Sequence, residues 1–327
     1  MMRLRADWRA DGALLLTTLI WGSTFVIAKD ILTRWPPFAY LGFRFGVASL
    51  ALALLFPRAL VRATREELRA GIILGLLVGG GFALQAIGQV YTTPSKSAFI
   101  TGLTTPLVPI VAYLFTGARP NVENATGIVL ASIGGALILM PREGGVNTGD
   151  LLTLACTVCF ALHIAFVSRY ASRYEIKRLT VFQIAVAAAC FIILWAFFRL
   201  LALEGDGPLA REASPLVWDA RICWQLIYLA LVATVFTFLL WTWGQARMSA
   251  THAAIIFSLE PVFATVFALA VRGSEEWFGV RGAVGATLVL AGVIVSELQW
   301  APRKKETAEQ ERRKEDVADQ TLQVFSE

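Results

Sequence analysis

Apolar residues run through the chain in ten long blocks, separated by short polar or charged segments. Each block is 17 to 23 residues long, close to the length that an α-helix needs to cross the hydrocarbon core of a bilayer. The two shortest blocks suit the helices of a tightly packed bundle. The pattern therefore predicts ten transmembrane helices, over residues 13–31, 38–56, 70–91, 95–116, 124–140, 150–168, 179–200, 222–244, 250–271 and 279–298.

Composition supports an all-α integral membrane protein. Of the 327 residues, 57% are hydrophobic and only 16% are charged, whereas soluble domains average about 25% charged residues. The first apolar block follows three arginines, as in a signal peptide, but it is long and no small-residue cleavage site follows it. We therefore expect a retained helix. The formal charge of +5 is information about topology and does not point to nucleic acid.

Basic residues predict that both termini are cytoplasmic. With the N-terminus inside, sixteen lysines and arginines of the loops, helix ends and adjoining tail are cytoplasmic and nine are external. The densest clusters, at 58–69 and 169–178, both fall inside, as the positive-inside rule requires.

The chain contains a weak internal repeat. Matches at offsets of 139, 156 and 158 residues stay in order over five helices. They include Trp21 with Phe160, Thr24 with His163, Arg44 with Gln183, Phe82 with Phe238, Gln89 with Gln245 and, one residue out of step, Pro106 with Pro261. Because five is odd, the second copy enters the membrane upside down, a plan typical of transporters with a midplane site. We predict two inverted repeats, residues 1–140 and 149–299, and a charged cytoplasmic tail at 300–327.

Aromatic and amide side chains recur on one helix face in each repeat. Phe82, Gln85 and Gln89 lie at i, i+3 and i+7, and Phe238, Trp241 and Gln245 repeat that spacing. Rings and amides together suit a cavity for a small amphipathic molecule, although glutamines also bridge membrane helices. The substrate-binding residues predicted from these faces, from the first and sixth helices and from the fourth are Trp21, Thr24, Phe25, Phe82, Gln85, Gln89, Phe99, Phe160, His163, Phe238, Trp241 and Gln245.

Four further residues are candidates for coupling or conformational change. Glu260 is the one charged residue between Arg247 and Arg272, and an ionisable group within an apolar span points to function by default. It is a candidate proton carrier, counter-charge or structural acceptor, with the structural or conformational role preferred. Pro106 and Pro261 are candidate hinges because proline interrupts helical hydrogen bonds. Arg44 either attracts a substrate carboxylate, or pairs with backbone carbonyls or extends its charge outward to the membrane surface, and the structural role is preferred.

Several segments together resemble the drug/metabolite transporter superfamily, in its ten-helix EamA-type branch. The segments are Trp21-Gly22, Phe43-Arg44, AIGQVYTTPSKSAFITGLTTPLVPI from 86 and WGQARMSATHAAIIFSLEPVFATVFA from 243. The chain departs from the family pattern at Phe160-Ala161, where tryptophan-alanine is usual, and in the loop at 272–276. The resemblance implies export of amino acids or related metabolites across a bacterial inner membrane.

Three other functions would require residues or domains of their own. A sugar-phosphate or nucleotide-sugar carrier of the same superfamily needs several cavity cations, and only Arg44 qualifies. An intramembrane enzyme needs a nucleophile, acid or metal set, and a sensor needs a signalling domain. The sequence contains no GxxxxGK[ST] loop, the motif that binds the phosphates of ATP, so we do not expect this chain to hydrolyse ATP. We expect a secondary transporter without cofactor or metal, a monomer or weak dimer in the bilayer, with a small-molecule substrate and protons as a candidate coupling ion.

Overall fold

The apolar blocks fold into helices throughout the part of the chain that the structure describes. The structure is a computed structural model, and it describes residues 8–61, 63–116, 122–139, 146–171, 173–201, 209–245, 256–257, 259–277 and 279–297. Within these ranges six helices are long and apolar enough to cross a membrane, and further apolar helices are shorter. An all-helical fold is therefore confirmed for the described residues. The predicted tail at 300–327 lies outside the described residues.

In the first half of the chain, local signals set the helix starts. Thr64 and Glu67 form a capping box, in which each side chain accepts from the other's backbone N–H. Pro37 and Pro94 occupy the first turn of their helices, where a missing N–H is harmless. The helices are α1 (Trp8–Leu32), α2 (Pro37–Leu55), α3 (Pro57–Val61), α4 (Arg65–Tyr91), α5 (Pro94–Gly102), α6 (Thr104–Thr116) and α7 (Val122–Leu139).

The second half carries one long helix with an irregular centre. Between α10 and α11 the backbone forms a π-helix, η2, in which hydrogen bonds reach five residues back. The helices are α8 (Thr148–Ala171), α9 (Ile176–Leu201), the 3₁₀ turn η1 (Ala210–Ala213), α10 (Ala220–Ile227), η2 (Tyr228–Phe236), α11 (Thr237–Gln245), α13 (Glu260–Arg272), the 3₁₀ turn η3 (Gly273–Glu276) and α14 (Gly279–Glu297).

Two predicted spans differ from the structure. The fourth, 95–116, is divided at Leu103 into α5 and α6, because Pro106 has no N–H to donate to Gly102 and its ring crowds that carbonyl. In the ninth, 250–271, Glu260 and Pro261 begin α13 instead of lying inside a helix. The described part of that span starts only at Ile256. The two interruptions meet, since a Cβ on Gly102 would lie 3.2 Å from Pro261 Cγ.

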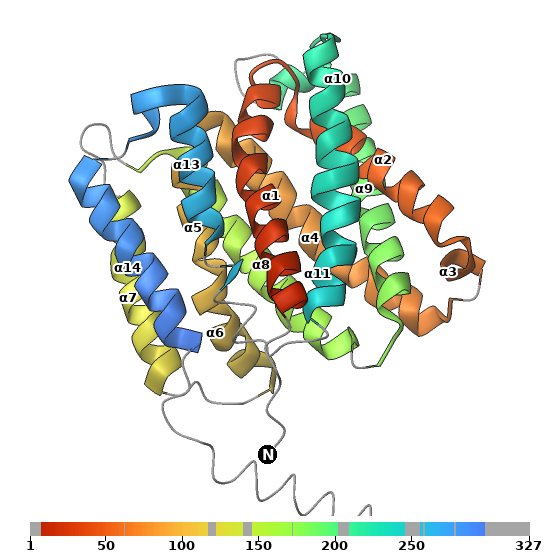
Figure 1. Ribbon diagram of the computed structural model, residues 1–327. Helices are drawn as coiled ribbons and strands as arrows, with labels where there is room; N and C mark the ends of the chain where they lie inside the picture. The colour runs from red at the N-terminus through yellow and green to blue at the C-terminus, as the bar shows by residue number, and fades with distance from the viewer. Residues whose placement is uncertain are drawn as a thin grey trace, which may run out of the picture. The chain divides into compact units, whose positions relative to one another are not determined.

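Helices distant in sequence pack side by side. The closest pairings join α7 with α14, α4 with α8 and α9, α2 with α9, and α1 with α13 and α11 (Figure 1). Small residues allow these approaches. A Cβ on Gly75 of α4 would lie 2.8 Å from the carbonyl oxygen of Gln183 in α9. The largest buried cluster, which includes Trp35, Phe45 and Phe191, fills the space among α1, α2, α4, α9 and the α10–η2 helix.

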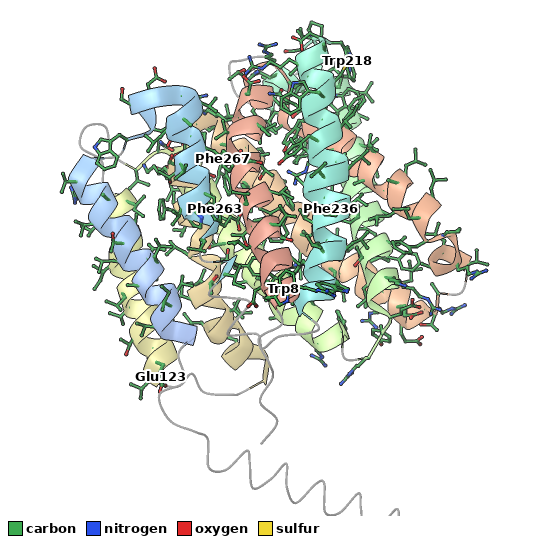
Figure 2. The ribbon with its side chains drawn as sticks, viewed as in Figure 1. Trp8, Glu123, Trp218, Phe236, Phe263 and Phe267 are labelled. Carbon is green, nitrogen blue, oxygen red and sulfur yellow. The ribbon has the colours of Figure 1, made fainter. Side chains whose placement is uncertain are left out.

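The outer surface of the helices is apolar. Large exposed side chains include Leu54, Val266 and Val280, and side chains of this kind belong against lipid. Figure 2 shows Trp8 and Trp218 at opposite ends of the helices, with Phe236 between them. Both tryptophans are more than half exposed, and the amphipathic indole ring suits the headgroup regions of a bilayer.

Candidate functional site

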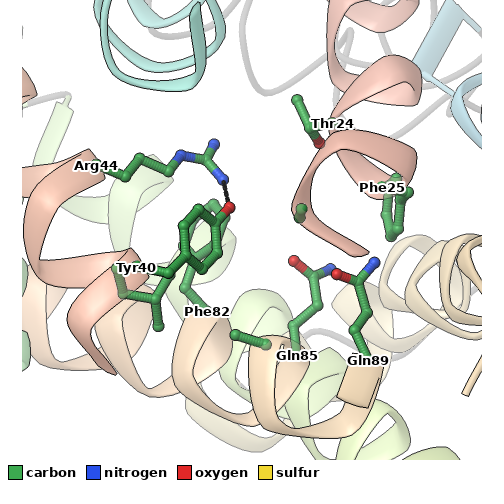
Figure 3. A pocket seen from close by; sticks show the side chains of 10 residues that line it. Thr24, Phe25, Tyr40, Arg44, Phe82, Gln85 and Gln89 are labelled. Carbon is green, nitrogen blue, oxygen red and sulfur yellow. Dashed lines mark hydrogen bonds between the residues drawn. The ribbon is translucent and has the colours of Figure 1, made fainter. Parts of the chain in front are cut away.

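A small cavity lies between α1, α2 and α4. It is narrow, with room for about one water molecule within its walls. Figure 3 shows side chains from all three helices converging on it. The lining residues are Thr24, Phe25, Ala28, Tyr40, Leu41, Arg44, Phe82, Gln85, Ala86 and Gln89.

Arg44 is the single charged residue among those that line the cavity. Its side chain is only 4% exposed. Nη1 donates to the hydroxyl of Tyr40 over 3.0 Å, and Nε donates to Thr234 Oγ1 of η2 over 3.2 Å. The guanidinium carbon also lies 4.9 Å from the centre of the Phe82 ring, close enough for a cation–π contact. All of these partners are neutral.

Two glutamines of α4 face Arg44 across the cavity (Figure 3). Gln85 Nε2 donates to Thr101 Oγ1 over 3.1 Å. Gln89 is 2% exposed, and its amide forms no hydrogen bond with a described residue. Since a buried amide normally finds partners, Gln89 presents unused donor and acceptor atoms to the cavity. The one-face spacing in the sequence predicted a cavity-lining position for both residues, and both lie on the wall of this cavity.

The other lining residues follow from helix geometry. Thr24, Phe25 and Ala28 occupy one side of α1, and Tyr40 stands one turn before Arg44 on α2. Tyr40, Leu41, Ala28 and Ala86 were not singled out by the sequence. The i, i+4 spacing of Tyr40 and Arg44 is the signal that would have found Tyr40. Phe25 also packs behind the cavity wall against Ala98 and Ala264.

A second group of predicted residues forms an aromatic cluster beside α1. The Trp21 ring stacks on Phe257 at 5.6 Å and meets Phe238 and Trp241 edge-on at 6.2 and 5.8 Å. Trp21 Nε1 donates to Thr237 Oγ1 over 3.0 Å. Trp241 Nε1 is buried and has no hydrogen-bond partner among the described residues. These rings do not line the cavity, but they join α1 to the helix that also holds Thr234.

The remaining predicted binding residues lie elsewhere. His163 Nε2 lies 2.7 Å from Gln183 Oε1, so it joins α8 to α9. Phe160 packs edge-on against Phe82, with its ring centre at 5.4 Å, behind the cavity wall. Phe99 belongs to a buried cluster of α5, α7 and α14. The side chain of Gln245 lies outside the described residues.

Glu260, Pro261 and Pro106 gather at the helix interruptions. Glu260 is in the first turn of α13, where a carboxylate interacts favourably with the helix dipole, and it makes no hydrogen bond or ion pair with a described residue. Pro261 is buried against α5 at Gly102. Pro106 is buried near the start of α6.

Polar contacts join the helices at one end of the bundle, which we term the Glu212 end: the end where α1, α4, α9 and α13 finish. Ion pairs there join Arg34 to Asp219 (2.6 Å), Lys96 to Asp150 (2.6 Å), Arg221 to Asp30 (2.9 Å) and Arg272 to Glu276 (3.0 Å). The first three connect residues before 140 with residues after 149. Lys29 Nζ donates to the carbonyls of Val90 and Thr92 at the end of α4.

Glu212 itself holds the start of α2. Its carboxylate accepts from the backbone N–H groups of Phe38 (2.8 Å) and Ala39 (3.4 Å). The residue is fully buried. Burial raises the pKa of Glu212 to about 7, although the two N–H groups favour the charged form.

Among the described residues, no group of three histidine, cysteine, aspartate or glutamate side chains is placed to hold a metal ion. Cys156 and Cys159, the C-x-x-C pair in the sequence, are free thiols on α8.

Comparison with known proteins identifies the family. The model described as the EamA-like transporter family matches residues 8–140 and again residues 147–298. The chain belongs to the EamA-like transporter family. This confirms the resemblance that the sequence motifs indicated, and it makes the chain a multi-pass membrane transporter.

The relatives of this EamA-like transporter are similar over nearly their whole length. It is 30% identical over 294 residues to an uncharacterized transporter of Archaeoglobus fulgidus, covering 89% of this chain and 86% of that one. It is 27% identical over 302 residues to a probable amino-acid metabolite efflux pump of Escherichia coli, covering 89% and 97%. A crystal structure with 17% identity and a TM-score of 0.62 covers 88% of this chain and 96% of its own, and shows the fold alone.

Proposed function

We propose that this EamA-like transporter is a secondary active exporter of small amphipathic metabolites, amino acids or related compounds. It acts in a bacterial inner membrane, and its substrate binds in the cavity between α1, α2 and α4. The observation that carries the proposal is that cavity within the membrane-spanning helices, in which Arg44, Gln85 and Gln89 converge among apolar and hydroxyl-bearing side chains. The relatives named as probable amino-acid metabolite efflux pumps support the substrate class.

The packing pattern supports ten spans in two inverted five-helix halves. A two-fold arrangement exchanges each helix with its repeat mate, so α7–α14 and α2–α9 should be contacts of equivalent helices, and both pairs are extensive. The repeat mate of α4 is the η2–α11 helix, and the mates of α8 and α9 are α1 and α2. The α4–α8 contact should therefore have a counterpart between the η2–α11 helix and α1, and the α4–α9 contact one between η2 and α2. Both of these contacts exist. Such halves rock against each other during alternating access.

The Glu212 end is then the external end, since the predicted topology puts both termini in the cytoplasm. Its ion pairs, Arg34–Asp219, Lys96–Asp150 and Arg221–Asp30, cross between the two halves. The cavity reaches toward this end, since its lining residues Ala28 and Gln89 directly precede Lys29 and Val90, which are joined there. We interpret the structure as a state that is closed to the outside, from which export requires these contacts to separate.

Counterflow in liposomes tests this function. The purified protein should exchange radiolabelled substrate for unlabelled compound across a panel of amino acids, their deaminated monocarboxylate analogues and drug-like cations. Gln85→Ala, in the cavity, and Trp241→Ala, in the aromatic cluster, should alter the order of preference while folded protein is recovered in normal yield. Loss of folded protein in both variants would assign these residues to packing, and absence of counterflow for the whole panel would refute the proposed function.

A further inference from the structure

The charge of Arg44 requires an explanation. It is buried in α2, two turns from the helix start and within the span, where a cation costs about 2.5–3.5 kcal/mol. Buried charges are normally paired with an opposite charge. Within the described residues no carboxylate contacts this guanidinium, whose partners are two hydroxyl groups and aromatic rings.

Its hydrogen-bonding capacity is also only partly used. A guanidinium has five N–H donors in a planar fork, and two of them are taken by Tyr40 and Thr234. Thr234 donates its own hydrogen to the carbonyl of Leu229 over 2.8 Å, so its oxygen is free to accept from Arg44. The π-helix thereby fixes the guanidinium beside the cavity, and Nη2 makes no hydrogen bond with a described residue.

The opposite wall offers a second polar group without a partner. Gln89 is 98% buried, lines the same cavity and makes no side-chain hydrogen bond with a described residue. An amide and an unpaired guanidinium facing one cavity are both suited to the oxygens of a carboxylate, for which arginine is the preferred partner.

The lining also limits the charge of the ligand. None of the ten lining residues is acidic, so a substrate ammonium group would face Arg44 without a counter-charge. One arginine matches one negative charge, whereas a phosphate dianion would call for more cations. The other lining side chains carry no charge, and half of the ten, Phe25, Ala28, Leu41, Phe82 and Ala86, are apolar.

Comparison of the two repeats shows that an unpaired buried charge occurs in the first half and not at the equivalent position of the second. The register pairs Thr24 with His163 and Arg44 with Gln183. In the second half those two mates hydrogen-bond to each other over 2.7 Å, so no charge is left over. The first half instead keeps a cation, for which the described part of the chain supplies no counterion.

We propose that the substrate is a small monocarboxylate anion with an apolar body, whose carboxylate binds Arg44 and Gln89, and that a free amine weakens its binding. The inference rests on the proposed transport function and deepens it. Bound carboxylate supplies the counter-charge that the cavity lacks, and the cavity widens from its present closed form to admit the apolar body.

Calorimetric titration of the intact protein in nanodiscs at pH 7.5 tests this with three probes of nearly equal shape. Phenyllactate is an anion, phenylalanine a zwitterion and phenylalaninol a cation. We expect affinity to fall in that order, with a loss of at least about tenfold from the first to the last. Arg44→Gln should abolish the preference and Arg44→Lys should keep part of it. Gln89→Leu should weaken the binding of phenyllactate. Arg199→Gln, the same change at an arginine away from the cavity, should leave the order unchanged.

The unchanged protein provides a result even where Arg44→Gln does not fold. Equal affinity for the three probes, tighter binding of phenylalaninol, or no binding of phenyllactate would overturn the inference. Counterflow of other compounds in that same protein would leave the transport function standing. Conversely, charge-ordered binding without counterflow of any compound would support the site and refute the transporter.

Discussion

The Lys96–Asp150 pair offers the sharpest test of how the Glu212 end, which is external in the proposed topology, closes. Asp150 is fully buried at the start of α8, and it accepts from Lys96 Nζ (2.6 Å), Thr92 Oγ1 (2.8 Å) and the backbone N–H of Asn147 (3.2 Å). Lys96 belongs to α5 in the first half and Asp150 to the second. If opening separates the halves here, Asp150→Asn removes an interaction that exists only in the closed state.

The size of the effect follows from burial. Removing one partner of a fully buried ion pair costs about 3–5 kcal/mol, largely because the other charge stays unpaired. The Lys96 side chain is 17% exposed, so water recovers part of that cost. Asparagine also keeps an oxygen for Thr92. We therefore expect a loss of about 2 kcal/mol, which shifts the ratio of closed to open molecules by roughly 30-fold toward open.

Reactivity of a single cysteine measures this shift. Ala28, which lines the cavity, is replaced by cysteine in a protein whose four native cysteines are removed, and a membrane-impermeant maleimide is added outside. Asp150→Asn should accelerate labelling by about the same 30-fold factor. Glu175→Gln breaks an exposed ion pair with Arg178 at the opposite end and should not accelerate it. Unchanged labelling in folded Asp150→Asn protein would refute the external-closure reasoning.

Three further predictions concern stability and coupling. Gly75→Ala should destabilise the folded protein by about 1–3 kcal/mol, because its Cβ would collide with Val186 and the Gln183 carbonyl. Gly12→Ala is the control: a Cβ there meets nothing within 4 Å, so this change should leave stability unchanged or raise it by up to about 1 kcal/mol. Equal unfolding temperatures for the two variants would contradict this. Burial raises the pKa of Glu212 from 4.5 to about 7, so about 3 kcal/mol of stability that is present below pH 4.5 is lost as the pH rises through 7. The unfolding temperature should therefore decrease as the pH is raised from 5 to 8, and Glu212→Gln should flatten this dependence. The same pH dependence in the variant would exclude Glu212 as its source. If Glu260 carries a coupling proton, Glu260→Gln should retain substrate binding but lose the response of liposome transport to an imposed pH gradient, and a normal response would reject that role.

Features that depend on neighbouring residues could be read from the sequence. The apolar blocks gave the helical membrane fold, since burial in lipid and internal backbone hydrogen bonding are properties of each segment. Helical spacing placed Phe82, Gln85 and Gln89 on one face, and all three line the cavity. Repeated motifs gave the family, which the comparison confirmed. Each of these inferences requires nothing beyond the order of residues within one helix or one repeat.

Contacts between distant segments were decided by tertiary structure. His163 shares its repeat position with Thr24, yet it meets Gln183 in place of the cavity, because the packing of α8 on α9 sets its partner. Arg44 gave no sign in the sequence of whether a carboxylate would reach it; only the docking of α2 against α4 and η2 left it facing neutral groups. Likewise, only the tertiary structure shows that the break in the fourth span, at Gly102 and Leu103, contacts Pro261 at the start of α13. Local order determines which face of a helix is polar, whereas the partner of that face depends on how helices far apart in the chain pack together.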